Sequence, residues 1–224
     1  MNKGVTLIEL IISLAIASIL ILGLYSVNSI SAKTSKQTRE NWYCMASIRN
    51  SILQLDLDLM QCAYLMPQDM KISTEKNQLF IAGLPHTSKH SGIRLNMNTL
   101  PPYFSIIIKS EGSCIKLDTI DIDNNSVPDF WADLGIITDS GPYVISHNYS
   151  RGNSRLPLTS KVNVNPGDRV IPAIHYELKS DGLYRDGQLL AEAITGFDAK
   201  INSGNLAIHL KASLNNTVKE LCYE

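Results

Sequence analysis

The chain has 224 residues, enough for one globular domain with an appendage. Its 20 basic and 21 acidic side chains leave a formal net charge of −1, and no long run of one sign occurs, so charge indicates no nucleic-acid partner. The sequence also shows no phosphate loop, dinucleotide fingerprint or nucleophile elbow, so we expect no enzymatic activity.

The first predicted element is an apolar helix near the N-terminus. No charged residue occurs between Leu10 and Ala32, and about 20 helical residues cross the ~30 Å hydrocarbon layer of a membrane. An ordinary signal peptide is the alternative, because residues 15–17 have the small-residue form of a cleavage site. The apolar run continues beyond that site, and Glu9 lies inside the apolar region, which is unusual for a signal peptide. We therefore predict a transmembrane helix.

The helical pattern continues beyond the membrane segment. From Met45 to Met66 apolar side chains recur at steps of three and four, which predicts a helix with one apolar stripe, and Pro67 ends it. One helix is thus expected from about Val5 to Met66, with a possible bend near Gly23. The alternative is a membrane anchor followed by a separate amphipathic helix.

After Pro67 the pattern changes to short strands and turns. We predict strands at 79–81, 104–108, 170–178, 183–185, 197–201 and 206–210. Pro172 predicts an edge strand or a bulge for the third of these. The expected fold is α+β, with a mostly antiparallel sheet folded over the apolar stripe of the long helix.

The stretch from Lys3 to Leu10, KGVTLIEL, resembles the leader of type IV pilins and pseudopilins. The resemblance implies that a membrane peptidase cleaves after Gly4 and methylates the new amine of Val5. Most members have Phe or another large apolar residue at this first mature position, so Val5 departs from the pattern. Glu9 becomes the fifth mature residue, the acid that in this family is thought to pair with the N-terminal amine of a neighbouring subunit.

The resemblance also implies a division of the chain and a topology. Residues 1–4 form the leader, 5–28 the transmembrane helix, 29–66 the amphipathic stalk helix and 67–224 the globular β-rich body. By charge alone, Lys33, Lys36 and Arg39 outnumber Lys3 and favour a cytoplasmic C-terminal side. The family topology is the opposite: a single pass through the inner membrane with the body outside the cytoplasm.

The C-terminal half resembles the J-type minor pseudopilins and W-type minor pilins, through loose patterns at 48–59, 176–185 and 190–197. The implied function is a structural subunit that primes or caps a type IV pilus or a type II secretion pseudopilus. Its implied partners are other pilin or pseudopilin subunits, the peptidase and methylase, the inner-membrane assembly platform and membrane lipid. The alternative is a tip-displayed adhesin or calcium-responsive binding module on a pilin-like anchor.

Four cysteines are candidates for disulfides: Cys44, Cys62, Cys114 and Cys222. Four cysteines allow three pairings, and a body outside the cytoplasm would permit disulfides. A Cys44–Cys62 bridge is excluded because 18 helical residues separate them by about 27 Å. We expect one bridge between Cys44 or Cys62 and a body cysteine, with buried free thiols as the alternative.

The segment 121–129 contains oxygen-bearing side chains at alternate positions. Asp121, Asp123, Asn125 and Asp129 could supply side-chain ligands and Val127 its carbonyl, as in the first part of an EF-hand loop. The sixth and twelfth positions lack the usual glycine and glutamate. The sequence therefore predicts a weak Ca²⁺ site, with an acidic, solvated turn as the alternative.

Overall fold

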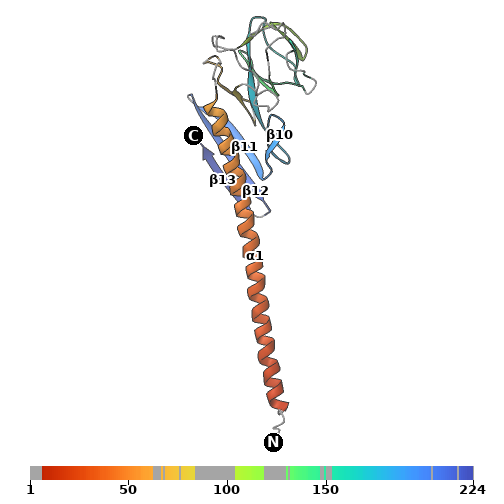
Figure 1. Ribbon diagram of the computed structural model, residues 1–224, viewed down its shortest axis with the longest axis vertical. Helices are drawn as coiled ribbons and strands as arrows, with labels where there is room; N and C mark the ends of the chain where they lie inside the picture. The colour runs from red at the N-terminus through yellow and green to blue at the C-terminus, as the bar shows by residue number, and fades with distance from the viewer. Residues whose placement is uncertain are drawn as a thin grey trace, which may run out of the picture.

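The computed structural model describes residues 7–62, 67, 69–75, 77–83, 104–118, 130, 132–146, 149, 153–202, 204–215 and 217–223. A single long helix descends from a β-rich head, and the N-terminus lies at the far end of this helix (Figure 1). The predicted α+β architecture, with a long helix packed on a mostly antiparallel body, is confirmed.

Helix α1 (Leu7–Met60) contains 54 residues and is therefore about 80 Å long. It ends earlier than the predicted Met66. The amide of Gln61 still bonds to the carbonyl of Leu57, but the amide of Cys62 bonds to the carbonyl of Leu59, a tighter turn that closes the helix.

The described strands form two sheets. The smaller sheet has three antiparallel strands in the order β11 (Ile194–Asn202), β12 (Asn205–Leu214) and β13 (Thr217–Tyr223), and it lies beside the upper part of α1 (Figure 1). The larger sheet contains β1 (Ile72–Glu75), β2 (Gln78–Ala82), β3 (Ser105–Glu111), β4 (Cys114–Leu117), β5 (Gly135–Thr138), β6 (Gly141–Val144), β7 (Arg155–Pro157), β8 (Arg169–Lys179), β9 (Gly182–Arg185) and β10 (Gln188–Ala191).

Strand β8 is central, so the predicted edge or bulge position of Pro172 is wrong. It pairs with β5 and β9 on one side and with β2 and β3 on the other. The carbonyl of Pro172 accepts a hydrogen bond from Gly83 on the β2 side, just beyond the end of that strand at Ala82. The amide and carbonyl of a strand residue point to the same side, so the position where Pro172 lacks an N–H also faces β2. Because β2 ends there, no acceptor of that strand is left without a donor.

Among the described residues the core has two clusters, and one of them joins α1 to the small sheet and to β2, β8 and β9 of the large sheet. Cys44, Ile48 and Leu55 of α1 are buried against alternate residues of the small sheet, including Phe197 and Leu210. The predicted stripe is confirmed in part, because Ile52, Leu59 and Cys62 also pack on the core while Met45 is 45% exposed. Packing of this face fixes α1 along the small sheet from Glu40 upward.

Candidate functional site: an exposed apolar helix and its junction with the head

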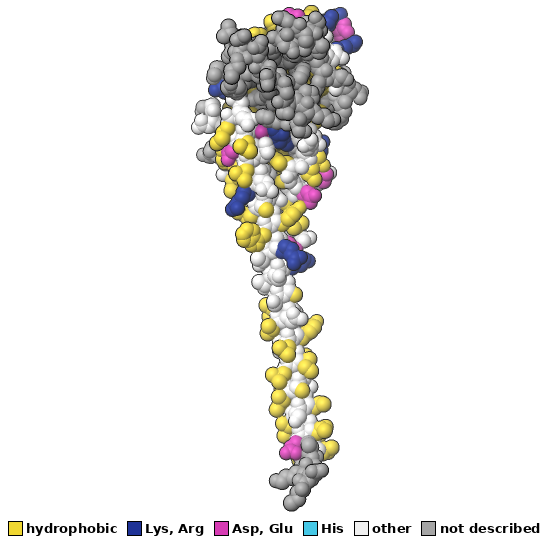
Figure 2. Space-filling model, in the orientation of Figure 1, with side chains coloured by type: hydrophobic (Ala, Val, Ile, Leu, Met, Phe, Trp, Pro, Cys, Tyr) yellow, Lys and Arg dark blue, Asp and Glu magenta, His cyan; other side chains and the backbone are white. Residues whose placement is uncertain are grey.

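The lower part of α1 projects away from the head. Every residue from 7 to 39 is exposed, with exposed fractions of 77% for Leu7 and 71% for Leu24 (Figure 2). The helix is long and apolar enough to cross a membrane: an 18-residue window has a mean hydropathy of 2.7 and none of it is buried. An apolar surface of this size requires lipid or other apolar helices around it.

Glu9 is the acidic residue of the first described turn of α1. A carboxylate there lies near the positive end of the helix dipole, which stabilises its charge. The side chains around it, including Ile8 and Leu10, are exposed and apolar. The predicted cleavage site and methylation site, Gly4 and Val5, lie outside the described residues. Cleavage, methylation and the charge pair of Glu9 therefore stay predictions.

The upper part of α1 is joined to the head by polar contacts as well as by the core. These contacts occur between the point where the helix enters the head and its last turn, and Asp56 and Asp58 face different sides of the helix. Glu40 accepts a hydrogen bond from Asn215 (2.6 Å), Tyr43 donates to Glu192 (2.8 Å), Asp56 accepts from Tyr223, and Asp58 accepts from Tyr176 (2.5 Å) and Arg185 (2.7 Å).

Asp58 is the centre of the most buried of these contacts. Its side chain is 2% exposed and that of Arg185 is 19% exposed. Two bonds from the guanidinium, of 2.7 and 2.9 Å, reach the two carboxylate oxygens, and the amide of Gln54 donates a third at 3.1 Å. Burial and the neighbouring Asp58 raise the pKa of Tyr176, so its hydroxyl remains a donor. Burial would lower the pKa of Arg185, but its bonds to Asp58 outweigh this effect and raise it.

The position of Asp58 conflicts with local helix preferences. An acid near a helix C-terminus faces the negative end of the dipole, and α1 has no basic residue in its last turn. Arg185 at the end of β9 and Tyr176 in the middle of β8 supply the missing donors. The last turn of α1 is therefore stabilised by the large sheet, from residues more than 100 positions away in sequence.

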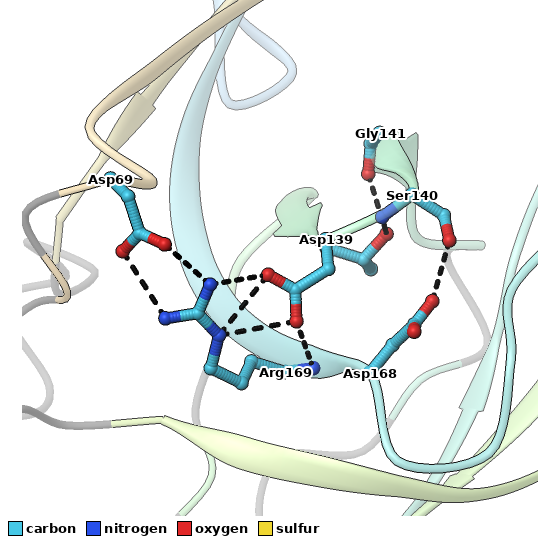
Figure 3. Close-up of polar contacts among 7 residues, drawn as sticks. Asp69, Asp139, Ser140, Gly141, Asp168 and Arg169 are labelled. Carbon is cyan, nitrogen blue, oxygen red and sulfur yellow. Dashed lines mark hydrogen bonds and ion pairs between the residues drawn. The ribbon is translucent and has the colours of Figure 1, made fainter.

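A second charged cluster connects the segment after α1 to the large sheet (Figure 3). Arg169 at the start of β8 binds Asp69 and Asp139 with two bonds of 2.5 Å among several. Asp168 accepts a bond of 2.5 Å from the hydroxyl of Ser140. Hydrogen bonding to Arg169 holds the pKa of Asp139 below its ordinary value. Because the guanidinium of Arg169 binds both Asp69 and Asp139, the cluster links the segment after α1 to the large sheet and has a structural role.

All four cysteines are free thiols in the structure, so the bridge that the sequence suggested is not present here. Cys44 is buried against the inner face of the small sheet, whereas Cys222 is exposed. Strand alternation turns Leu221 toward the core and Cys222 toward the outside, which puts the sheet between Cys222 and Cys44. Cys114 lies in β4, where its sulfur accepts a bond from Arg155 at 3.1 Å.

His175 is the one buried side chain for which the described residues leave a polar atom, Nε2, without a hydrogen-bond partner. Its ring stacks on Phe80, with 4.8 Å between centroids. Burial lowers the pKa of His175 to about 4, while the nearby charges of Glu177 and Lys179 act in opposite directions. The ring is therefore neutral at pH 7.

The predicted calcium ligands, Asp121, Asp123, Asn125, Val127 and Asp129, all lie outside the described residues, so the Ca²⁺ site stays a prediction. Within the part of the chain that the structure describes, no group of three His, Cys, Asp or Glu side chains could hold a metal ion.

Sequence reasoning missed the cluster of Asp58, Arg185 and Tyr176. One signal was available, because an acid in the last helical turn without a neighbouring base is unfavourable. Sequence could not identify the distant partners, since no local pattern links β8 or β9 to the end of α1.

Residues 1–25 match the family model described as the prokaryotic N-terminal methylation motif. The chain thus carries that motif. The match covers Gly4, Val5, Glu9 and most of the exposed apolar part of α1, and it supports the likeness of this region to type IV pilins and pseudopilins. No curated protein and no solved structure matched the chain.

Proposed function

We propose that the chain is a minor subunit of a type IV pilus or a type II secretion pseudopilus, with a structural rather than a catalytic role. The observation that supports this most is the combination of the methylation motif with an apolar helix that is exposed along its whole lower part. Such a helix is stable in lipid before assembly and among other apolar helices afterwards.

In this proposal a peptidase removes residues 1–4 on the cytoplasmic side, and the methylated amine of Val5 pairs with Glu9 of a neighbouring subunit. Within one straight helix the two groups are four residues, or about 6 Å, apart along the axis, so a shifted neighbour can bring them together. The pairing offsets the cost of placing two charges in an apolar surrounding. The assembly platform and the other subunits are the partners that this step requires.

The outer face of the upper helix also supports assembly. Trp42, Met45, Leu53, Leu57 and Met60 are between 45% and 83% exposed. Four of them lie on the side of α1 opposite the buried stripe, namely Trp42, Leu53, Leu57 and Met60, and Met45 lies beside the stripe. A row of exposed large apolar side chains along about 27 Å of helix suits packing against another helix.

The decisive experiment replaces Glu9 in the full-length chain. We expect Glu9→Gln to leave leader cleavage intact, as measured by the mass of the mature chain, and to reduce co-purification with filaments severely. Glu75→Gln is the matched control, because Glu75 is exposed in β1 on the head. Normal incorporation of the Glu9 variant would refute the charge pair, and an uncleaved wild-type chain would refute the proposed function.

A further inference from the structure

Between the apolar segment and the head, α1 contains a stretch that we call the neck, residues 26–39. It has three basic residues, no acidic residue and six Ser or Thr side chains. Every residue of the neck is exposed, and the first described contact with the head is that of Glu40. The neck buries no face against its own protein, so its charged and hydroxyl side chains are free to contact an outside partner.

The three bases, Lys33, Lys36 and Arg39, follow one another at steps of three and therefore lie on one ridge of the helix. None of the ion pairs among the described residues includes them. The nearest acids along α1 are Glu9, at the other end of the apolar segment, and Glu40, which already binds Asn215. Figure 2 shows dark-blue side chains on the helix just below the head, above its apolar part. Glu40 lies one turn above Lys36 and is a partial counter-charge for it, whereas Lys33 has no acidic residue within four positions on either side.

The height of the ridge matches a membrane surface. A ~30 Å hydrocarbon layer counted from Leu7 ends near Val27, so Lys33 lies about 9 Å and Lys36 about 13 Å above it. Helical side chains lean toward the N-terminus, which brings both ammonium groups closer to the membrane. The headgroup region is roughly 5 to 7 Å thick and charges act over a Debye length of about 8 Å. Both lysines are thus within electrostatic reach of the headgroups.

Hydroxyl groups accompany these charges. Four hydroxyl side chains line a shallow hollow on the surface of the neck together with Arg39, and Trp42 lies at its upper end; the four are Ser31, Thr34, Ser35 and Thr38. Hydroxyls and a guanidinium are donors that phosphate oxygens accept. Arg39 is the basic residue that borders this hollow, so the neck offers phosphate a positive charge and hydrogen-bond donors there, whereas Lys33 and Lys36 lie on another face of the helix.

We propose that the neck binds the headgroups of anionic phospholipids in the leaflet on the head side of the membrane. This inference rests on the proposed function, because it requires α1 to span the membrane. Charge counting alone would keep these bases on the cytoplasmic side, so an anionic counter-charge on the head side would stabilise their opposite placement. Anionic headgroups supply it without any other protein, and they lie directly beside the neck.

The test uses the full chain reconstituted in phosphatidylcholine vesicles that contain a trace of spin-labelled lipid. Electron paramagnetic resonance resolves protein-bound from free lipid and measures the association of labelled phosphatidylglycerol relative to labelled phosphatidylcholine. One basic residue near a membrane surface changes binding by up to roughly fivefold. We therefore expect a preference of at least twofold for phosphatidylglycerol at low salt, which high salt abolishes.

The double variant Lys33→Gln/Lys36→Gln should reduce this preference to about one. The matched control Lys109→Gln/Lys116→Gln removes two exposed charges from the head and should leave it unchanged. A ratio of one for the wild type, or a preference that survives the neck double variant, would overturn the inference. If the wild type shows no lipid preference but the neck double variant no longer enters filaments, the ridge instead binds an acidic surface of a partner protein.

A separate measurement distinguishes this failure from failure of the proposed function. Alkaline carbonate should leave the wild-type chain and the neck variant in the membrane fraction. A chain that leaves the membrane would refute the spanning helix and with it both proposals, whereas a retained chain without lipid preference refutes only the role of the neck.

Discussion

Replacing Asp58 by Asn should destabilise the head because it removes one partner of a buried ion pair. The carboxylate side chain is 2% exposed and accepts bonds from Arg185, Tyr176 and Gln54. Asparagine keeps the size of the side chain but loses its charge, and its amide group faces donors where the carboxylate accepted. The guanidinium of Arg185 then remains largely buried without a counter-charge.

The expected loss is about 3 kcal/mol in the free energy of unfolding, at the lower end of the ~3–5 kcal/mol typical of breaking a buried pair. The lower value applies because the side chain of Arg185 is 19% exposed and water can solvate part of the unpaired charge. Tyr176→Phe should cost less, about 1.5 to 3 kcal/mol, since it removes one hydrogen bond to a charged group and leaves the pair intact.

Urea unfolding of the full chain in detergent, followed by the β-sheet signal in circular dichroism, measures these differences. At a slope of about 3 kcal/mol/M, a loss of 3 kcal/mol lowers the midpoint by roughly 1 M. Glu111→Gln is the matched control, because its ion pair with Lys109 is exposed, with side-chain exposures of 58% and 66%. It should leave the urea midpoint close to that of the wild type, because water screens an exposed pair. Equal midpoints for Asp58→Asn and Glu111→Gln would refute our account of the buried pair.

Four further outcomes are expected. Burial lowers the pKa of His175 to about 4, so between pH 6.5 and 4 the unfolded chain binds a proton more readily than the folded chain. The free energy of unfolding should therefore fall by up to about 3 kcal/mol as the pH drops through this range. In His175→Phe this part of the fall should be absent, which urea midpoints at pH 7 and 4.5 would show. Maleimide should label exposed Cys222 rapidly and buried Cys44 only after denaturation, as measured by mass spectrometry of the labelled peptides. Equal labelling of the two thiols in the folded chain would contradict the burial of Cys44. Gly182 has φ +148°, and a Cβ there would lie 2.4 Å from a neighbouring carbonyl oxygen, so Gly182→Ala should lower the melting temperature by several degrees. In Gly204→Ala the new Cβ would meet no atom within 4 Å, so the melting temperature should fall by less. For Glu9→Gln we expect a normally cleaved chain with impaired incorporation, and unimpaired filaments containing the variant would contradict that expectation.

The local elements of this protein follow from short-range patterns. The run without charge between Leu10 and Ala32 predicts an apolar helix of membrane length, and alternation at 206–210 predicts a strand, in which the structure buries Ile208 and Leu210. Both predictions depend on the period of a single element, which neighbouring residues define completely. The N-terminal methylation motif is local in the same way, since it lies within one contiguous stretch.

Predictions that depended on distant partners were less accurate. Pro172 reads as an edge residue because proline lacks a donor, yet it lies in the most extensively paired strand. The structure tolerates Pro172 because β2 ends where its missing N–H would bond. The residues around Pro172 do not show where β2 ends, so the sequence could not predict this. Met45 likewise fits the apolar period but is exposed, since the head covers a narrower arc of α1 than the period suggests.

The sequence by itself determined that this chain has an N-terminal methylation motif, an apolar helix of membrane length, a basic neck and a β-rich head. Only the tertiary structure decided how the helix and the head are joined. Asp58 is unfavourable in an isolated helix and becomes stabilising only when β8 and β9 place Tyr176 and Arg185 beside it. Helical and strand periods are local, whereas the partner of a buried charge depends on chain segments brought together by the whole fold.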